Sequence, residues 1–123
     1  ATVVASGNDG FTDAMGAPAC ISTAVSVGST NKDDNVRASS NVTPFLSLFA
    51  PGGSIEAAIP GTTVNSFGFK SGTSMAAPHV AGAWAVFKAS PGHGNDAVGT
   101  VLTQFQNTGV PITDTRGSMP TNT

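Results

Sequence analysis

The residue best suited to chemistry in this sequence is Ser74, which lies in the stretch GTSMAAPHVAG at residues 72–82. The leading glycine allows a tight turn, and the small residues after Ser74 predict a helix. A serine at the start of a helix lies beside free backbone N–H groups and the positive end of the helix dipole. Both favour an oxyanion next to its hydroxyl. The stretch therefore indicates a nucleophilic serine.

A second interpretation assigns these hydroxyl residues no chemistry. Thr73 or Ser74 can cap a helix by accepting hydrogen bonds from the free N–H groups of its first turn. For an arbitrary Gly-Thr-Ser before a helix, capping is the preferred interpretation. The full eleven-residue stretch favours the chemical one.

Three segments occur in an order that resembles one protein family. They are VVASGNDG at residues 3–10, FAPGGSI at residues 49–55 and the serine segment. Together they resemble the subtilisin-like serine proteases over nearly the whole chain. The resemblance implies that Ser74 is the nucleophile and that the carboxamide of Asn8 and the backbone N–H of Ser74 bind the oxyanion. The alternative for Asn8 is a turn residue, because Asn-Asp-Gly favours turns.

The other half of a serine protease site is missing from the sequence. A nucleophilic serine needs a base and a carboxylate that orients it. In the family both precede the serine, and the seven residues before Asn8 contain neither Asp nor His. His79 is about 500° of helix rotation past Ser74, so we expect a structural role, with a ring nitrogen bonded to nearby backbone. We expect His93 to be a surface residue.

The resemblance therefore predicts a serine endopeptidase fragment carrying the nucleophile and oxyanion half of the site. An upstream segment would supply the Asp and the His, and the chain alone is expected to be inactive. The alternative is a non-catalytic module that binds a partner or packs against one. An unrelated hydrolase with a Gly-x-Ser-x-Gly elbow is disfavoured, because that motif does not surround Ser74.

Candidate substrate contacts also follow from the resemblance. Ala5, Ser6 and Gly7 align with one wall of the primary specificity pocket, and Gly16 falls near its base. Small residues there imply a roomy, uncharged pocket for a large apolar side chain of a peptide or protein substrate. A plain turn is an equal alternative for Gly16. The two residues before the serine, Gly72 and Thr73, are also expected to border the substrate.

No cofactor is required for this chemistry. Family members often bind calcium through carboxylates and other oxygen ligands. One such site has an aspartate just before the Ala-Pro-Gly turn, where this sequence has Ser47. We therefore expect that site to be weak or absent, and structural calcium elsewhere in the full domain stays open. The triplet at residues 41–43, Asn-Val-Thr, matches a glycosylation acceptor, a pattern that is frequent by chance.

Composition excludes several partners. The net charge is −2 with only five Lys and Arg, so we expect no nucleic-acid partner. The apolar stretch at residues 75–87 is too short to span a bilayer, so we expect no membrane partner. The single cysteine, Cys20, cannot form a disulfide within the chain. Low charge with abundant small polar residues favours an extracellular enzyme.

The expected fold is α/β, a partial three-layer subtilisin-like fold with a mainly parallel sheet and a buried central helix starting at the serine. Residues 1–123 form one piece of a peptidase domain, which we expect to be truncated at the N-terminus and trimmed at the C-terminus. The hydrophobic pattern predicts elements between polar loops, the longest at residues 30–43. The predicted strands are residues 2–5, 24–27, 45–49 and 64–70, and the predicted helices are residues 74–89 and 95–105.

Overall fold

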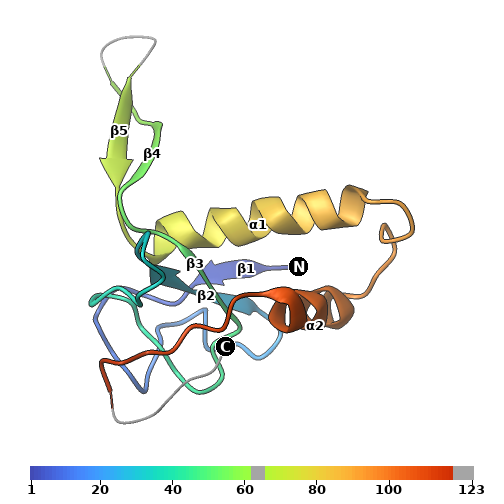
Figure 1. Ribbon diagram of the computed structural model, residues 1–123, viewed down its shortest axis with the longest axis horizontal. Helices are drawn as coiled ribbons and strands as arrows, with labels where there is room; N and C mark the ends of the chain where they lie inside the picture. The colour runs from blue at the N-terminus through green and yellow to red at the C-terminus, as the bar shows by residue number, and fades with distance from the viewer. Residues whose placement is uncertain (62–65, 118–123) are drawn as a thin grey trace.

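A three-stranded parallel sheet forms the centre of the molecule (Figure 1). The computed structural model of the chain describes residues 1–61 and 66–117. The strands β1 (Val3–Ala5), β2 (Val25–Thr30) and β3 (Leu48–Pro51) lie in the order β1-β2-β3. Every residue of β2 is buried, as expected for a central strand covered on both faces. The prediction of an α/β fold with a parallel sheet is confirmed.

Two helices contribute to the core on one face of the sheet. They are α1 (Thr73–Ala89) and α2 (Val98–Thr108). Val25 and Val27 of β2 belong to the same buried cluster as residues of both helices. The ring of Trp84 in α1 meets the edge of Phe105 in α2, with centroids 5.4 Å apart. The helices therefore pack against each other as well as against the strands.

Irregular segments cover the opposite face of the sheet. Gly28 in β2 lies against Phe49 and Leu46, and a Cβ atom at Gly28 would be 2.6 Å from the Phe49 ring. Val42 and Ile112 join Leu46 in a second buried cluster. The sheet thus lies between a helical layer and a layer of loops.

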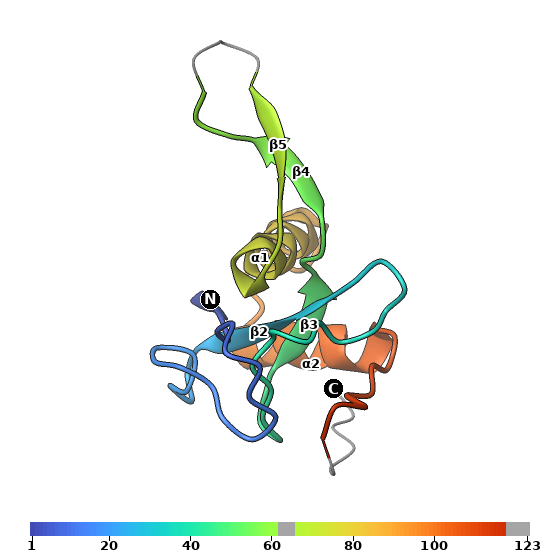
Figure 2. The same cartoon turned by 90° about the vertical axis from the view of Figure 1, so that its left-hand side faces the viewer.

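An antiparallel hairpin connects β3 to α1 and projects away from the body of the molecule (Figures 1 and 2). Its strands are β4 (Ile55–Ala58) and β5 (Phe67–Lys70). At the base of the hairpin, the N–H of Gly72 donates to the carbonyl of Gly52 at 2.8 Å. This bond fixes the point at which the chain enters α1.

Several predicted boundaries are wrong. Strand β2 extends to Thr30, strand β3 begins three residues later than expected, and β4 was not predicted. The predicted strand at 64–70 is confirmed only for Phe67–Lys70, because residues 64 and 65 lie outside the described residues. Helix α2 begins at Val98 rather than residue 95 because His93 and Asp96 form a turn in which the N–H of Asp96 donates to the carbonyl of His93.

The predicted surface loop at residues 30–43 is exposed only in part. Lys32, Asp33 and Asp34 are exposed, as their charge suggests. The second half of the segment carries fully buried residues, among them Asn41 and Val42. This half forms part of the layer beneath the sheet and is not a free loop.

Helix α1 is buried along one face only. Its buried residues are Thr73, Ala76, Val80 and Trp84. The opposite face, which includes Ala81 and Ala85, is exposed in this chain. The sequence predicted burial on all sides, because alanines and a glycine surround the helix and carry no polar face.

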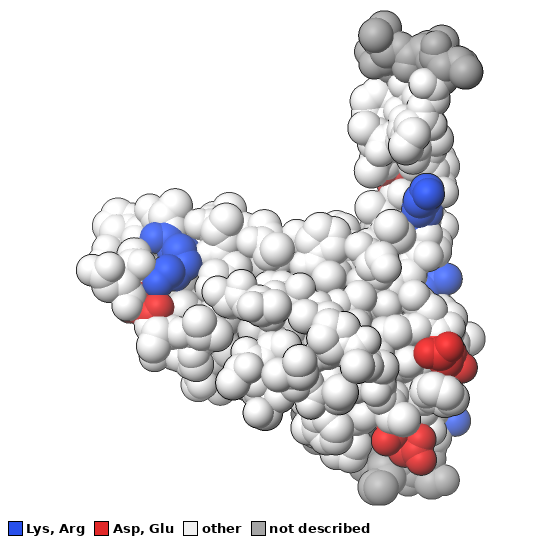
Figure 3. Space-filling view, turned by 180° about the vertical axis from the view of Figure 1, so that it is seen from behind, with Lys and Arg blue, Asp and Glu red and all other residues white. Residues whose placement is uncertain are grey.

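Charge is sparse on the surface. Figure 3 shows a mostly uncharged face with isolated Lys, Arg, Asp and Glu side chains and no continuous basic patch. Within residues 1–61 and 66–117, neither helix has the length and apolarity needed to cross a membrane.

Candidate active site

Ser74 is the second residue of α1 and is exposed to solvent. Gly72 is the N-cap of the helix, with φ at 145°, a region that L side chains rarely adopt. The N-cap residue, Gly72, has no side chain that could make a capping hydrogen bond, and neither Thr73 nor Ser74 occupies the N-cap position. The interpretation that Thr73 and Ser74 only cap the helix is therefore wrong. The Ser74 hydroxyl is left at the surface beside the positive end of the helix.

Asn8 lies directly against the residue that precedes Ser74. The Oδ1 atom of Asn8 accepts a hydrogen bond from the Thr73 N–H at 3.0 Å and another from the Thr73 hydroxyl at 3.2 Å. Because a backbone N–H can only donate, the atom facing Thr73 must be the amide oxygen. The sequence motifs that contain Asn8 and Ser74 therefore meet in space, as the resemblance required.

Two hydrogen-bond donors remain at this junction. Among residues 1–61 and 66–117, no group accepts from the Nδ2 amide of Asn8 or from the backbone N–H of Ser74. The Nδ2 amide points away from Thr73, because the Oδ1 atom of the same planar group is bound there. Both are donors of the kind that can stabilise the oxyanion of a tetrahedral intermediate.

The remaining predicted substrate residues surround the same junction. Ala5 ends β1, and the N–H of Gly7 donates to the Thr73 hydroxyl at 3.3 Å. Ser6 is fully buried and donates its hydroxyl inward to the carbonyl of Asn41. The N–H of Gly16 donates to the carbonyl of Ser6 at 3.2 Å, so the two segments are adjacent. A Cβ atom at Gly16 would meet no atom within 4 Å.

Neither histidine is hydrogen-bonded to Ser74 in the described part of the chain. His79 Nδ1 lies 2.8 Å from the carbonyl oxygen of Met75, so the predicted structural bond to nearby backbone is confirmed. His93 follows the far end of α1 and is half-buried, with its ring 4.4 Å from that of Phe87 and Nδ1 2.7 Å from Asp96 Oδ2. His93 thus keeps the expected surface position, with its side chain 44% exposed, and in addition packs on Phe87 and bonds Asp96.

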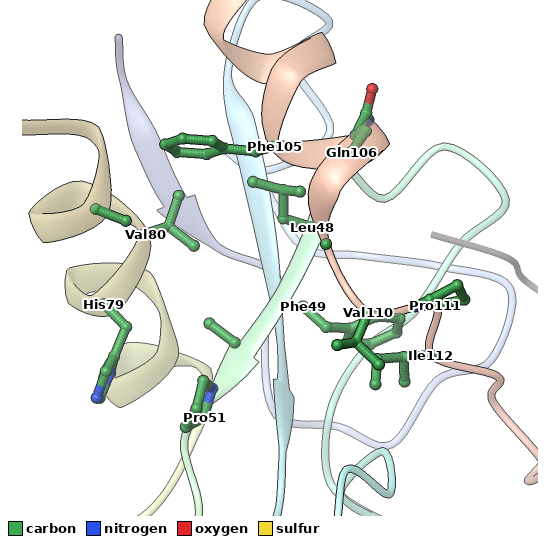
Figure 4. A pocket seen from close by; sticks show the side chains of 13 residues that line it. Leu48, Phe49, Pro51, His79, Val80, Phe105, Gln106, Val110, Pro111 and Ile112 are labelled. Carbon is green, nitrogen blue, oxygen red and sulfur yellow. The ribbon is translucent and has the colours of Figure 1, made fainter. Parts of the chain in front are cut away.

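A hollow of about 280 Å³ adjoins Ser74. Its walls come from β4 and the first turns of α1, and they are mostly apolar: Ile55, Ala57, Met75, Pro78 and His79. A larger hollow of about 650 Å³ lies between β3, α1 and the segment after α2 (Figure 4). Ser74 lines the smaller hollow and not the larger one, and Asn8 lines neither.

Ser47 forms two reciprocal hydrogen bonds with Ser26 of β2. The hydroxyl of Ser47 accepts from the N–H of Ser26 at 3.1 Å, and the hydroxyl of Ser26 accepts from the N–H of Ser47 at 3.0 Å. In the described part of the chain, no three His, Cys, Asp or Glu side chains gather in a way that could hold a metal ion. The weak or absent calcium site at Ser47 stays a prediction.

The glycosylation triplet is not accessible in the folded chain. Asn41 has 0% exposure, and its carboxamide is bonded to the loop that carries Asn8. A glycan acceptor must be at the surface. The match at residues 41–43 is therefore a chance occurrence.

One buried carboxyl group lies apart from the serine. Arg116 holds the pKa of Asp114 below its usual value, chiefly through hydrogen bonds from its side chain and then its backbone N–H, while burial opposes the shift. Arg116 also donates to the carbonyls of Arg37 and Ala38. This pair fastens the end of the described chain to the layer beneath the sheet.

Comparison with known proteins agrees with this geometry. The sequence pattern described as the Subtilase family matches residues 1–104. This chain belongs to the subtilase family. The subtilase chain is 41% identical over 119 residues to "Subtilisin-like protease 1" of Trichophyton verrucosum and, at the same identity, to that of Arthroderma benhamiae. It is 40% identical to the protein of the same name from Trichophyton rubrum.

These alignments cover 97% of the subtilase chain but only 29% of the Trichophyton verrucosum and Arthroderma benhamiae proteins. The share is 23% for the Trichophyton rubrum protein. The chain therefore spans less than a third of each of these relatives.

Proposed function

We propose that this chain supplies the nucleophile and the oxyanion site of a serine endopeptidase. The observation that carries the proposal is the junction of Asn8 with the start of α1. Ser74 is exposed there, and the carboxamide of Asn8 is held with its oxygen on Thr73 and its Nδ2 amide unbound among the described residues. A module that only packs against a partner has no physical need for this pairing.

In the proposed reaction the Ser74 hydroxyl oxygen attacks the carbonyl carbon of a peptide bond and gives its proton to a base. The carbonyl oxygen becomes an oxyanion, which accepts hydrogen bonds from Asn8 Nδ2 and the Ser74 N–H. Collapse of this intermediate breaks the C–N bond. The base returns the proton to the leaving amine, and water then hydrolyses the acyl-enzyme.

The base and its orienting carboxylate would come from a segment upstream of Ala1. The hollow beside Ser74 supports this part of the proposal, because it is a mostly apolar site next to the hydroxyl. His79 borders it, but the Nδ1 atom of His79 is bound to the Met75 carbonyl and not to Ser74. An imidazole placed there would be within reach of the Ser74 proton.

We propose a peptide or protein substrate with a large apolar side chain before the cleaved bond. The open space around Gly16, next to Ser6, supports a roomy pocket without charge. Extracellular action and structural calcium in the full domain are part of the same proposal, the first from composition and the second from the family.

Labelling with a fluorophosphonate tests the proposal, because this reagent modifies only an activated serine rapidly. The complete protein that contains this chain should be labelled at Ser74, and the variant Ser74→Ala should not. Ser22→Ala is the matched control, since Ser22 is exposed and makes no side-chain hydrogen bond in the described structure. Labelling of Ser74 no faster than that of free serine would leave the non-catalytic module as the function.

A further inference from the structure

Asn41 binds the loop that carries Asn8 through nearly every polar atom that it has. Its Oδ1 atom accepts from the N–H of Asp9 at 2.9 Å and from the N–H of Phe11 at 3.1 Å. Its Nδ2 amide donates to Asp9 Oδ2 at 2.9 Å and to the carbonyl of Ser6 at 3.4 Å. The side chain of Asn41 therefore holds the loop on both sides of Asn8.

The backbone of Asn41 adds two more bonds to the same loop. Its N–H donates to the carbonyl of Gly7 at 3.0 Å, and its carbonyl accepts from the hydroxyl of Ser6 at 2.7 Å. Asn41 has 0% exposure, so these bonds lie out of water, where they are strong and directional. The contact is also close, because a Cβ atom at Gly7 would lie within 2.3 Å of Asn41 Nδ2.

Asn8 is consequently held from two directions. Thr73 fixes the orientation of its carboxamide, and Asn41 fixes the backbone from which that carboxamide extends. Asn41 lies 32 residues from Asp9 in the sequence, and within the described part of the chain it makes no hydrogen bond to Thr73 or Ser74. Any effect of Asn41 on the chemistry is therefore indirect and acts through the loop that carries Asn8.

We infer that Asn41 is a positioning residue for the oxyanion donor Asn8. This inference rests on the proposed function. A donor stabilises a transition state only where it meets the developing charge, and a shift of about 1 Å costs up to about 10²-fold in rate. Asn41 supplies the four side-chain bonds that hold the Asn8 loop in place.

A double-mutant cycle in the complete enzyme tests the inference. Asn41→Ala should lower kcat by about tenfold or more and change KM for a peptide by less than about threefold. In an Asn8→Ala background the same substitution should lower kcat by less than about twofold, because the donor that Asn41 positions is already absent. An equal loss in both backgrounds would overturn the inference.

A milder variant covers the case in which Asn41→Ala does not fold. Asp9→Ala removes one partner of the Asn41 amide at an exposed residue. It should lower kcat by about two- to fivefold, and this effect too should disappear in the Asn8→Ala background. An unchanged kcat for Asp9→Ala, with Asn41→Ala unfolded, would assign Asn41 to stability alone and overturn the inference.

Val101→Ala is the matched control for lost stability. Val101 is fully buried in the cluster between the helices and the sheet. This variant should lower the melting temperature without changing kcat. The two failures are distinguishable. Wild-type enzyme that neither cleaves peptides nor is labelled at Ser74 would refute the proposed function, whereas an active enzyme with equal losses in both backgrounds would refute only the role of Asn41.

Discussion

The carboxamide of Asn8 is anchored to Thr73 by two hydrogen bonds across 65 residues of sequence, one from the backbone N–H and one from the hydroxyl. This anchor uses the first free N–H of α1 and leaves the next one, on Ser74, for a ligand. Orientation follows from the chemistry of the amide, because only its oxygen can accept from Thr73. The Nδ2 end of Asn8 therefore faces away from Thr73.

Removal of that donor should slow catalysis without weakening substrate binding. Asn8→Ala in the complete enzyme should lower kcat by about 10²–10³-fold, the range measured when the equivalent donor is removed from subtilisin itself. KM should change little, because the interaction strengthens only in the transition state. Steady-state kinetics on a peptide substrate measure both values, and a rise in KM with unchanged kcat would contradict this role.

The Thr73 hydroxyl should contribute through the orientation of Asn8. Thr73→Val removes the hydrogen bond from the hydroxyl to Asn8 Oδ1, together with the long one that the hydroxyl accepts from the Gly7 N–H, and keeps the shape of the side chain and the backbone N–H. The loss of one such bond is worth about 1 kcal/mol, which predicts a decrease of about fivefold in kcat. Thr73→Ser keeps the hydroxyl and should restore most of the rate. Equal kcat values for the Val and Ser variants would show that the hydroxyl is dispensable.

Gly16 offers a test of the substrate pocket. A valine side chain at this position meets no protein atom within 4 Å of its Cβ, so Gly16→Val should fold normally. If Gly16 lies near the base of the pocket, the added methyl groups should lower kcat/KM for a substrate with Phe before the cleaved bond by about tenfold or more. The value for a substrate with Ala there should change much less. A parallel decrease for both substrates would place Gly16 outside the pocket.

Low pH should weaken the attachment of the segment around Asp114 and Arg116 to the rest of the protein. Arg116 lowers the pKa of Asp114 in the folded protein. The carboxylate therefore contributes stability at pH values above the pKa that Asp114 has in the unfolded chain, near 3.8. That contribution is lost as pH falls through the lower folded value. Asp114→Asn should lower the free energy of unfolding by about 2 kcal/mol near neutral pH and should reduce the dependence on pH below about 4. Thermal unfolding of both proteins between pH 6 and pH 3 measures the difference, and parallel curves would contradict the assignment.

The serine end of the site is predictable from sequence because its information is local. A glycine turn followed by small residues is sufficient to predict that Ser74 opens a helix, and a bond from the His79 ring to backbone one turn away follows from helix geometry. The same local rules did not identify the cap. They favour a hydroxyl at the helix end, but Asn8, from another part of the chain, already satisfies the N–H of Thr73.

The contacts of Asn41 could not be predicted from local sequence either, because its partners come from a distant part of the chain. In the sequence Asn41 belongs to a polar stretch, and its only recognisable pattern was a glycosylation triplet. Its burial depends on the parallel pairing of β2 with β3 and on the loop that follows β1. The available signal was the serine and asparagine content of a segment between two predicted strands, which is compatible with buried hydrogen bonds but does not require them.

The bond between Gly52 and Gly72 closes the stem of the β4–β5 hairpin. Everything outside this stem is an arm whose two ends are already joined, so lengthening it carries only a small additional entropic cost. Residues can therefore be inserted or removed at the tip while the nucleophile keeps its place. A peptide tag inserted in this arm should therefore leave the entry of the chain into α1 unchanged.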